Sequence, residues 1–124
     1  MIFDASALLA ILRSEPGGED AHRHLAGAAI SAVNFSEAVA VLIRKGMPHE
    51  AAQEAVEEVE LDVVTFDRDQ AYRTARLVPA TAARGLSLGD RSCLALAQSK
   101  GLPALTAERE WEHLDAGVRI VRIR

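Results

Sequence analysis

The stretch MIFDASALLAIL, residues 1–12, decides the fold, because one carboxylate interrupts an apolar run that then resumes with helical spacing. Residues 1–3 predict a short buried strand, and residues 5–12 predict a helix with almost no polar face. Asp4 stands at the junction, where its side chain can accept hydrogen bonds from the free amides of the first helical turn. The stretch therefore predicts a strand followed directly by a helix, with either a helix cap or a functional carboxylate between them.

The rest of the chain repeats this change from strand to helix. Short apolar segments predict strands at 28–32, 61–66, 102–106 and 117–123. Helical spacing, capping residues and glycine exits predict helices at 19–26, 34–46, 48–60, 67–78, 86–101 and 107–114. Strands separated by helices imply parallel pairing through right-handed crossovers. We expect a single domain over residues 1–124, an α/β/α three-layer sandwich around a mainly parallel sheet.

Composition limits the function classes. The net charge of −4 argues against a protein that coats nucleic acid through a broadly basic surface. Cys93 is the only cysteine, which excludes an intrachain disulfide and a thiolate zinc site, and its apolar helix predicts a core position. No apolar run reaches the roughly 20 residues that a membrane span needs. We expect a cytoplasmic protein without a membrane segment.

Four acids follow strands or begin helices in this pattern: Asp4, Glu37, Asp90 and Glu108. In parallel α/β sheets the ligand site lies beyond the carboxyl ends of the strands. Asp4 and Glu108 each follow a predicted strand, and Glu37 and Asp90 lie in the first turns of predicted helices. We therefore expect the four carboxylates at one edge of the sheet.

Helix capping is a simpler explanation for each acid taken alone. Asn34 with Glu37, and Ser87 with Asp90, have the spacing of capping boxes. Thr106 is placed to cap the helix predicted at 107–114, and acids favour helix N-termini in general. Both explanations remain open for each acid.

The combination of acids favours a metal site. Carboxylates gathered in one cleft repel each other, and this repulsion raises their pKa values and destabilises the fold. Mg²⁺ or Mn²⁺ would remove the repulsion, because these ions prefer oxygen ligands. Ser6, Ser36 and Thr106 are short polar side chains near the acids, suited to hydrogen-bond a metal-bound water or a ligand carboxylate.

The segments MIFDASALLAIL, NFSEA, GLSLGDRSCLALA and LPALTAEREW resemble, in order and spacing, the four acidic motifs of PIN-domain ribonucleases. The resemblance is strongest to VapC-like toxins of type II toxin–antitoxin systems. It implies that Asp4, Glu37 and Asp90 are the central ligands of Mg²⁺ or Mn²⁺. Glu108 stands where the family usually has aspartate, so its carboxylate reaches about 1.5 Å further. Ser6 and Thr106 match the hydroxyl residues of the first and fourth motifs.

The resemblance also implies an activity and partners: metal-dependent endoribonuclease cleavage of RNA, a homodimer, and a VapB-like antitoxin laid across the early helices. The apolar helix at 5–12 fits this expectation, since a sheet covers only one side of it. Arg13, Arg91 and Arg109 are candidates to hold RNA phosphates, with solvated or ion-paired roles as the alternative. The four histidines fall in segments that read as exposed, and Trp111 reads as a packing residue.

Three other classes of protein share part of this pattern. A receiver domain has this length and fold class, with Asp67 as phosphoacceptor and Thr106 as switch hydroxyl, but it needs an acid pair after the first strand. A haloacid-dehalogenase-like phosphatase needs a second aspartate where Ser6 stands. A PIN fold without catalysis would act only as a binding module, with Glu108 failing to complete the site.

Overall fold

The structure, a computed structural model, describes all 124 residues and contains one five-stranded sheet in the order β3-β2-β1-β4-β5. All four strand pairings are parallel, and β1 is the central strand. This confirms the predicted parallel sheet. The strands are β1 (Ile2–Phe3), β2 (Ala29–Ser31), β3 (Asp62–Val64), β4 (Ala104–Thr106) and β5 (Ile120–Arg122).

Both faces of the central strands are buried, which explains why their sequences are apolar without alternation. Successive residues of a strand point to opposite faces, so each register position contributes to one core cluster only. The two rows are Ile2, Ala29 and Ala104 on one face, and Phe3, Ile30 and Leu105 on the other.

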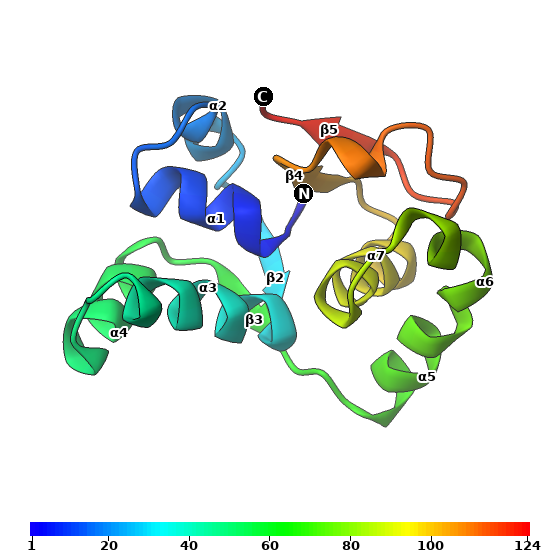
Figure 1. The fold of residues 1–124 in the computed structure, drawn as a ribbon, viewed down its shortest axis with the longest axis horizontal. Coiled ribbons are helices and arrows are strands. Elements are labelled where there is room, and N and C mark those ends of the chain that lie inside the picture. The colour runs from blue at the N-terminus through cyan, green and yellow to red at the C-terminus, as the bar shows by residue number, and fades with distance from the viewer.

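Helices cover both faces and complete the predicted three layers (Figure 1). On one side lie α1 (Ala5–Leu12), α2 (Gly18–Arg23), α3 (Ala32–Arg44) and α4 (His49–Glu58). On the other side lie α5 (Arg68–Arg76), α6 (Val78–Thr81) and α7 (Leu88–Lys100), with short 3-10 turns η1 (Ala82–Arg84) and η2 (Arg109–Trp111). Seven residues of α7 are buried, including Cys93, so the predicted core position of the cysteine is confirmed.

The predicted start of the helix after β2 is wrong by two residues. Its N-cap is Ser31, whose hydroxyl accepts a hydrogen bond from the Val33 amide at 3.2 Å. Because the chain already turns into the helix at the last residue of β2, Asn34 lies inside the first turn. Asn34 and Glu37 therefore do not form the predicted capping box.

The helix predicted at 107–114 is also wrong, since only the 3-10 turn η2 forms there. Trp111 is 1% exposed and packs into the cluster around α7, which confirms its predicted packing role. Glu112 is already extended, and His113 has a positive φ of 61°. Burial of one large side chain thus shapes this segment more strongly than helical propensity, which is weak over so few residues.

The chain's own helices cover α1, which corrects the expectation that a partner is needed to do so. Residues 7–10 of α1 are buried, and α1 packs against α2, α3 and β4. Gly18 makes the approach of α2 possible, since a Cβ there would lie 2.4 Å from the Ala10 carbonyl oxygen. Only the ends of α1 are partly exposed.

The end of the chain packs on the turn between α1 and α2. Gly17 has a φ of +91°, and a Cβ at this position would lie 2.3 Å from the Ile123 carbonyl oxygen. The Arg124 guanidinium donates to the Pro16 carbonyl at 3.0 Å. In Figure 1 the C-terminus accordingly lies beside α2. None of the helices combines the length and the apolar character needed to cross a membrane.

Candidate active site

Asp4 is buried at the carboxyl end of the central strand, with 3% of the residue exposed. Its Oδ1 accepts hydrogen bonds from the Ala7 amide at 2.8 Å and the Ser6 hydroxyl at 2.7 Å, so Asp4 does cap α1. Its Oδ2 accepts a bond from the Thr106 hydroxyl at 2.6 Å. A cap needs only one of these oxygens, and the second one joins β1 to the end of β4.

Thr106 and Ser6 link Asp4 to the segment that carries Glu108. The Thr106 Oγ1 accepts a hydrogen bond from the Glu108 amide at 2.9 Å, and the Ser6 Oγ accepts one from the Ala107 amide at 2.8 Å. The two hydroxyls lie 3.3 Å apart. Ser6 and Thr106, two of the three short polar residues expected near the acids, therefore contact Asp4 directly and fix where the chain leaves β4. Ser36, the third, is exposed on α3 and forms no hydrogen bond with any of the four acids.

Glu37 lies on α3 with its carboxylate over Gly89 of α7. A Cβ on Gly89 would fall 1.9 Å from the Glu37 Oε1, so only glycine leaves room for this carboxylate. The Asn34 amide nitrogen donates to the Glu37 Oε1 at 3.2 Å and to the Gly89 carbonyl at 2.9 Å. Asn34 thus connects the helix that carries Glu37 with the helix that carries Asp90.

Asp90 is half-buried in the first turn of α7 and forms the predicted capping box with Ser87. The Ser87 hydroxyl accepts from the Asp90 amide at 3.2 Å, and the Asp90 Oδ2 accepts from the Ser87 amide at 2.9 Å. The cap leaves Oδ1 of Asp90 without a hydrogen-bond partner in the chain. Capping and a role at the site are therefore compatible for Asp90, as they are for Asp4.

The pKa values of three of the acids are raised by burial and by neighbouring carboxylates. Burial raises the pKa of Asp4 to about 6, against the hydrogen bonds from Thr106, Ser6 and Ala7, and the charge of Asp90 adds to the increase. Partial burial and Asp90 also raise the pKa of Glu37. Burial and the charge of Asp4, followed by those of Glu110 and Asp90, raise the pKa of Glu108. The pKa values of Asp4, Glu37 and Glu108 are therefore each raised in part by the charge of Asp90.

No lysine, arginine or histidine forms an ion pair with any of the four acids. An uncompensated group of carboxylates with hydroxyl neighbours is a donor set that fits a hard divalent cation such as Mg²⁺ or Mn²⁺. The side chains are not drawn together into a preformed coordination group of three or more ligands. Ligation by Asp4, Glu37, Asp90 and Glu108 therefore remains a prediction, supported by the chemistry of the donors.

The three candidate arginines have different surroundings. Arg13 is exposed and forms an ion pair with Glu15, with 3.0 Å between Nη1 and Oε2. Arg91 is half-buried beside Asp90, and Arg109 is exposed beside Glu108; neither forms an ion pair or a side-chain hydrogen bond. Arg91 and Arg109 are thus the two that are free to meet an anionic substrate.

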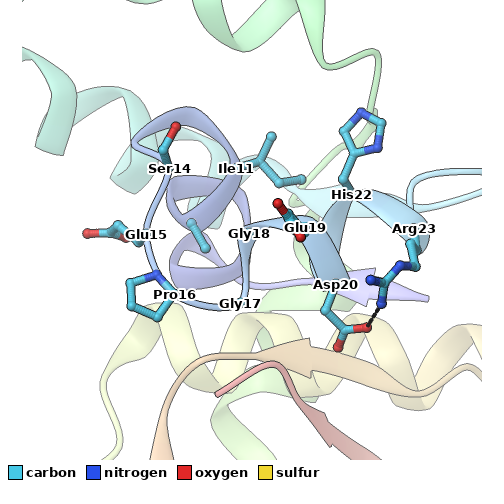
Figure 2. A pocket seen from close by; sticks show the side chains of 11 residues that line it. Ile11, Ser14, Glu15, Pro16, Gly17, Gly18, Glu19, Asp20, His22 and Arg23 are labelled. Atoms are coloured by element: carbon cyan, nitrogen blue, oxygen red, sulfur yellow. Dashed lines mark hydrogen bonds and ion pairs between the residues drawn. The ribbon is translucent and has the colours of Figure 1, made fainter.

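A hollow of the surface lies elsewhere, at the turn between α1 and α2. It measures about 820 Å³ and is lined by residues such as Ser14, Glu15, Asp20 and Arg23, with none of the four acids among them (Figure 2). The only ion pair drawn there joins Arg23 to Asp20. The acid site is accordingly an edge of the sheet and separate from this hollow.

Sequence reasoning misses two residues of the site: Asn34, which reads only as a helix cap, and Gly89, for which nothing is predicted. Cys93 is buried beneath the acids, where burial and then the charges of Asp4, Asp90 and Glu37 raise the pKa of its thiol well above the usual value. The sequence offers one signal for Gly89. Glycine is a poor helix former, so a glycine beside Asp90 in the first turn of a helix indicates that a side chain would not fit there.

Comparisons with known proteins match the chain over most of its length. A model of the PIN domain family matches residues 1–117. Ribonuclease VapC42 of Mycobacterium tuberculosis is 31% identical over 126 aligned positions, which cover 93% of this chain and 95% of that protein. A VapC ribonuclease of Mycobacterium bovis matches with the same identity and coverage.

Two solved structures share the fold. The DNA-bound VapBC structure from Salmonella typhimurium superposes with a TM-score of 0.78 at 22% identity, covering 99% of this chain and 97% of that one. The VapBC2 structure from Rickettsia felis, bound to a DNA fragment from its promoter, has a TM-score of 0.75 at 15% identity and covers 98% of both chains. At these identities the likeness concerns the fold.

Proposed function

The chain belongs to the PIN-domain family, and on that premise we propose that it is a metal-dependent endoribonuclease that acts as the toxin of a type II toxin–antitoxin system. The relatives at 31% identity are named as VapC ribonucleases. The observation that supports the proposal is that the charge of Asp90 acts on Asp4, Glu37 and Glu108, while none of the four acids has a cationic partner.

The chain's residues have distinct roles in this proposal. Asp4, Glu37 and Asp90 would hold Mg²⁺ or Mn²⁺, and Glu108 would hold a second ion or a metal-bound water. A bound divalent ion supplies an activated water for attack on phosphorus and stabilises charge on the leaving oxygen. Ser6 and Thr106 keep Asp4 in place through hydrogen bonds to both of its oxygens. No side chain is needed as a nucleophile.

Arginines next to the acids would position the RNA. Arg91 and Arg109 adjoin Asp90 and Glu108 and have no intramolecular partner, so their guanidinium groups are available to phosphate oxygens. Arg13 is paired with Glu15 and is the weakest of the three candidates.

The receiver-domain alternative does not fit the topology. Asp67 lies beyond β3, the outermost strand, and β2 separates that strand from β1 and Asp4. Asp67 is exposed and caps α5 by accepting a hydrogen bond from the Gln70 amide at 2.9 Å. It has the position of an ordinary N-cap, and the alternative that remains is a PIN fold that binds RNA without cleaving it.

The direct test is RNA cleavage by the purified protein. We expect endonucleolytic products with Mg²⁺ or Mn²⁺, none with EDTA, and a loss of at least 100-fold in rate for Asp4→Asn and for Asp90→Asn. Asp67→Asn is the matched control, because Asp67 is also an N-cap aspartate whose amide variant keeps the capping oxygen. Cleavage that survives both site substitutions would refute the assignment, and binding of RNA without cleavage by the wild type would favour the binding module.

We further propose two protein partners. One is a second copy of the chain, and the other is a VapB-like antitoxin that inhibits by reaching the acid edge. The support for the antitoxin is the fold shared with a chain of a toxin–antitoxin complex from Klebsiella pneumoniae and with VapBC-5 from Mycobacterium tuberculosis, a member of the VapBC family of toxin–antitoxin systems.

A further inference from the structure

Asn34 and Gly89 lie where the two helices of the acid site meet. Asn34 is 2% exposed, Gly89 is buried, and the hydrogen bond between them is the only side-chain bond that joins α3 to α7. Glu37 is one helical turn after Asn34, and Asp90 directly follows Gly89. A contact at this point fixes the relative position of the two helix starts from which both carboxylates extend.

The two ends of the Asn34 amide have different surroundings, and packing alone does not explain this difference. The Asn34 amide donates to both Gly89 and Glu37, but its Oδ1 is buried and has no hydrogen-bond partner. A buried acceptor without a partner lowers stability, and an apolar side chain of similar size would avoid that cost. The amide's two donated bonds are therefore the feature that distinguishes asparagine from leucine here.

Gly89 contributes by what it lacks. Its backbone lies in the first turn of α7 without a positive φ, so glycine is not needed there for conformational reasons. A Cβ at this position would lie 1.9 Å from the Oε1, 2.6 Å from the Oε2 and 2.5 Å from the Cδ of Glu37. The obstructed atoms are the end of one flexible side chain, so alanine would displace Glu37 and leave the helix intact.

We propose that Asn34 and Gly89 are positioning residues of the acid site: the Asn34 amide joins α3 to α7, and the missing side chain of Gly89 admits the Glu37 carboxylate beside Asp90. The inference rests on the proposed function, because it assigns the pair to the site that holds the divalent ion. Neither residue touches the reacting atoms in this assignment.

The test is a double-mutant cycle with Mn²⁺ affinity as its readout, measured by calorimetry on the purified protein without RNA. We expect Gly89→Ala to weaken Mn²⁺ binding at least fivefold, with a melting temperature equal to or above that of the wild type, because alanine is the better helix former. In the Glu37→Ala background the same substitution should have no further effect, since the displaced carboxylate is already gone.

Asn34→Leu gives the second arm, since it keeps the approximate size of the side chain and removes both donated bonds without adding a charge. We expect at least fivefold weaker Mn²⁺ binding, whereas Thr74→Val, which changes a buried and unpartnered hydroxyl on α5, should leave the affinity unchanged. Unchanged affinity in Gly89→Ala, or an equal loss in both backgrounds, would overturn the positioning role alone. Absence of both Mn²⁺ binding and RNA cleavage in the wild type would overturn the proposed function, and this inference with it.

Discussion

At the scale of single residues, Asp4 combines a structural and a chemical role in one side chain. Burial raises its pKa from 3.8 to about 6, so between these values the native state holds a proton that the unfolded state has released. The free energy of unfolding of the metal-free protein should therefore fall as pH rises from about 4 to about 6, and stay low above that range. Raised pKa values at Glu37 and Glu108 act in the same direction.

Asp4→Asn should remove most of this slope and be more stable than the wild type at pH 7.5 by about 2 to 3 kcal/mol, at roughly 1.4 kcal/mol per pKa unit. Denaturant unfolding in EDTA across pH 4 to 8 measures both effects. Asp67→Asn, an exposed cap, should keep the slope of the wild type. A stability of the wild type that rises over this range would contradict the raised pKa of Asp4.

At the scale of elements, the first turn of α7 supports both the helix and the site through its capping box. Ser87→Ala removes the hydroxyl that accepts from the Asp90 amide and should lower the free energy of unfolding by about 1 kcal/mol. Ser36→Ala is the control, because Ser36 is exposed on α3 and forms no side-chain hydrogen bond; its stability should stay within about 0.5 kcal/mol of the wild type. Chemical denaturation of both variants at one pH decides the comparison.

Most helices and strands could be predicted, because the interactions that specify them act between residues close in the sequence. The helix at 5–12 and the box of Ser87 with Asp90 follow from periodicity and capping chemistry that act over a few residues. The start of α3 was not predictable by the same means, since Ser31 and Asn34 are both good capping residues and only the end of β2 selects between them. The helix predicted at 107–114 was wrong because the burial of Trp111, which shapes this segment, depends on residues from the whole core.

The expected position of the acids could be drawn from topology, and Ser6 and Thr106 from their match to the first and fourth motifs, but the contact between Asn34 and Gly89 could not. Strand ends place Asp4 and Glu108 at one edge, and helix starts bring Glu37 and Asp90 there, which follows from topology alone. The bond from Thr106 to Asp4 spans 102 positions of sequence, and the bond from Asn34 to Gly89 spans 55. Such contacts depend on the packing of the layers, which no spacing in the sequence records.

At the scale of the whole molecule, the surface still carries large apolar side chains after the helices have covered each other. Val63, Tyr72 and Leu88 are 40%, 61% and 55% exposed. We expect the proposed homodimer, so light scattering on the purified protein should give twice the 13.3 kDa of the chain, and a ternary complex of greater mass with the antitoxin. A mass of 13.3 kDa at every concentration tested would contradict the dimer and leave the acid site unaffected.

The position of β1 in the middle of the sheet has a consequence for biosynthesis. The central strand and its aspartate are translated about a hundred codons before one of the two neighbouring strands and before the threonine that holds the aspartate. A nascent polypeptide on the ribosome therefore carries Asp4 and Glu37 long before they can be brought to one place. The carboxylates come together only after residue 106 has been added and β4 has paired with β1.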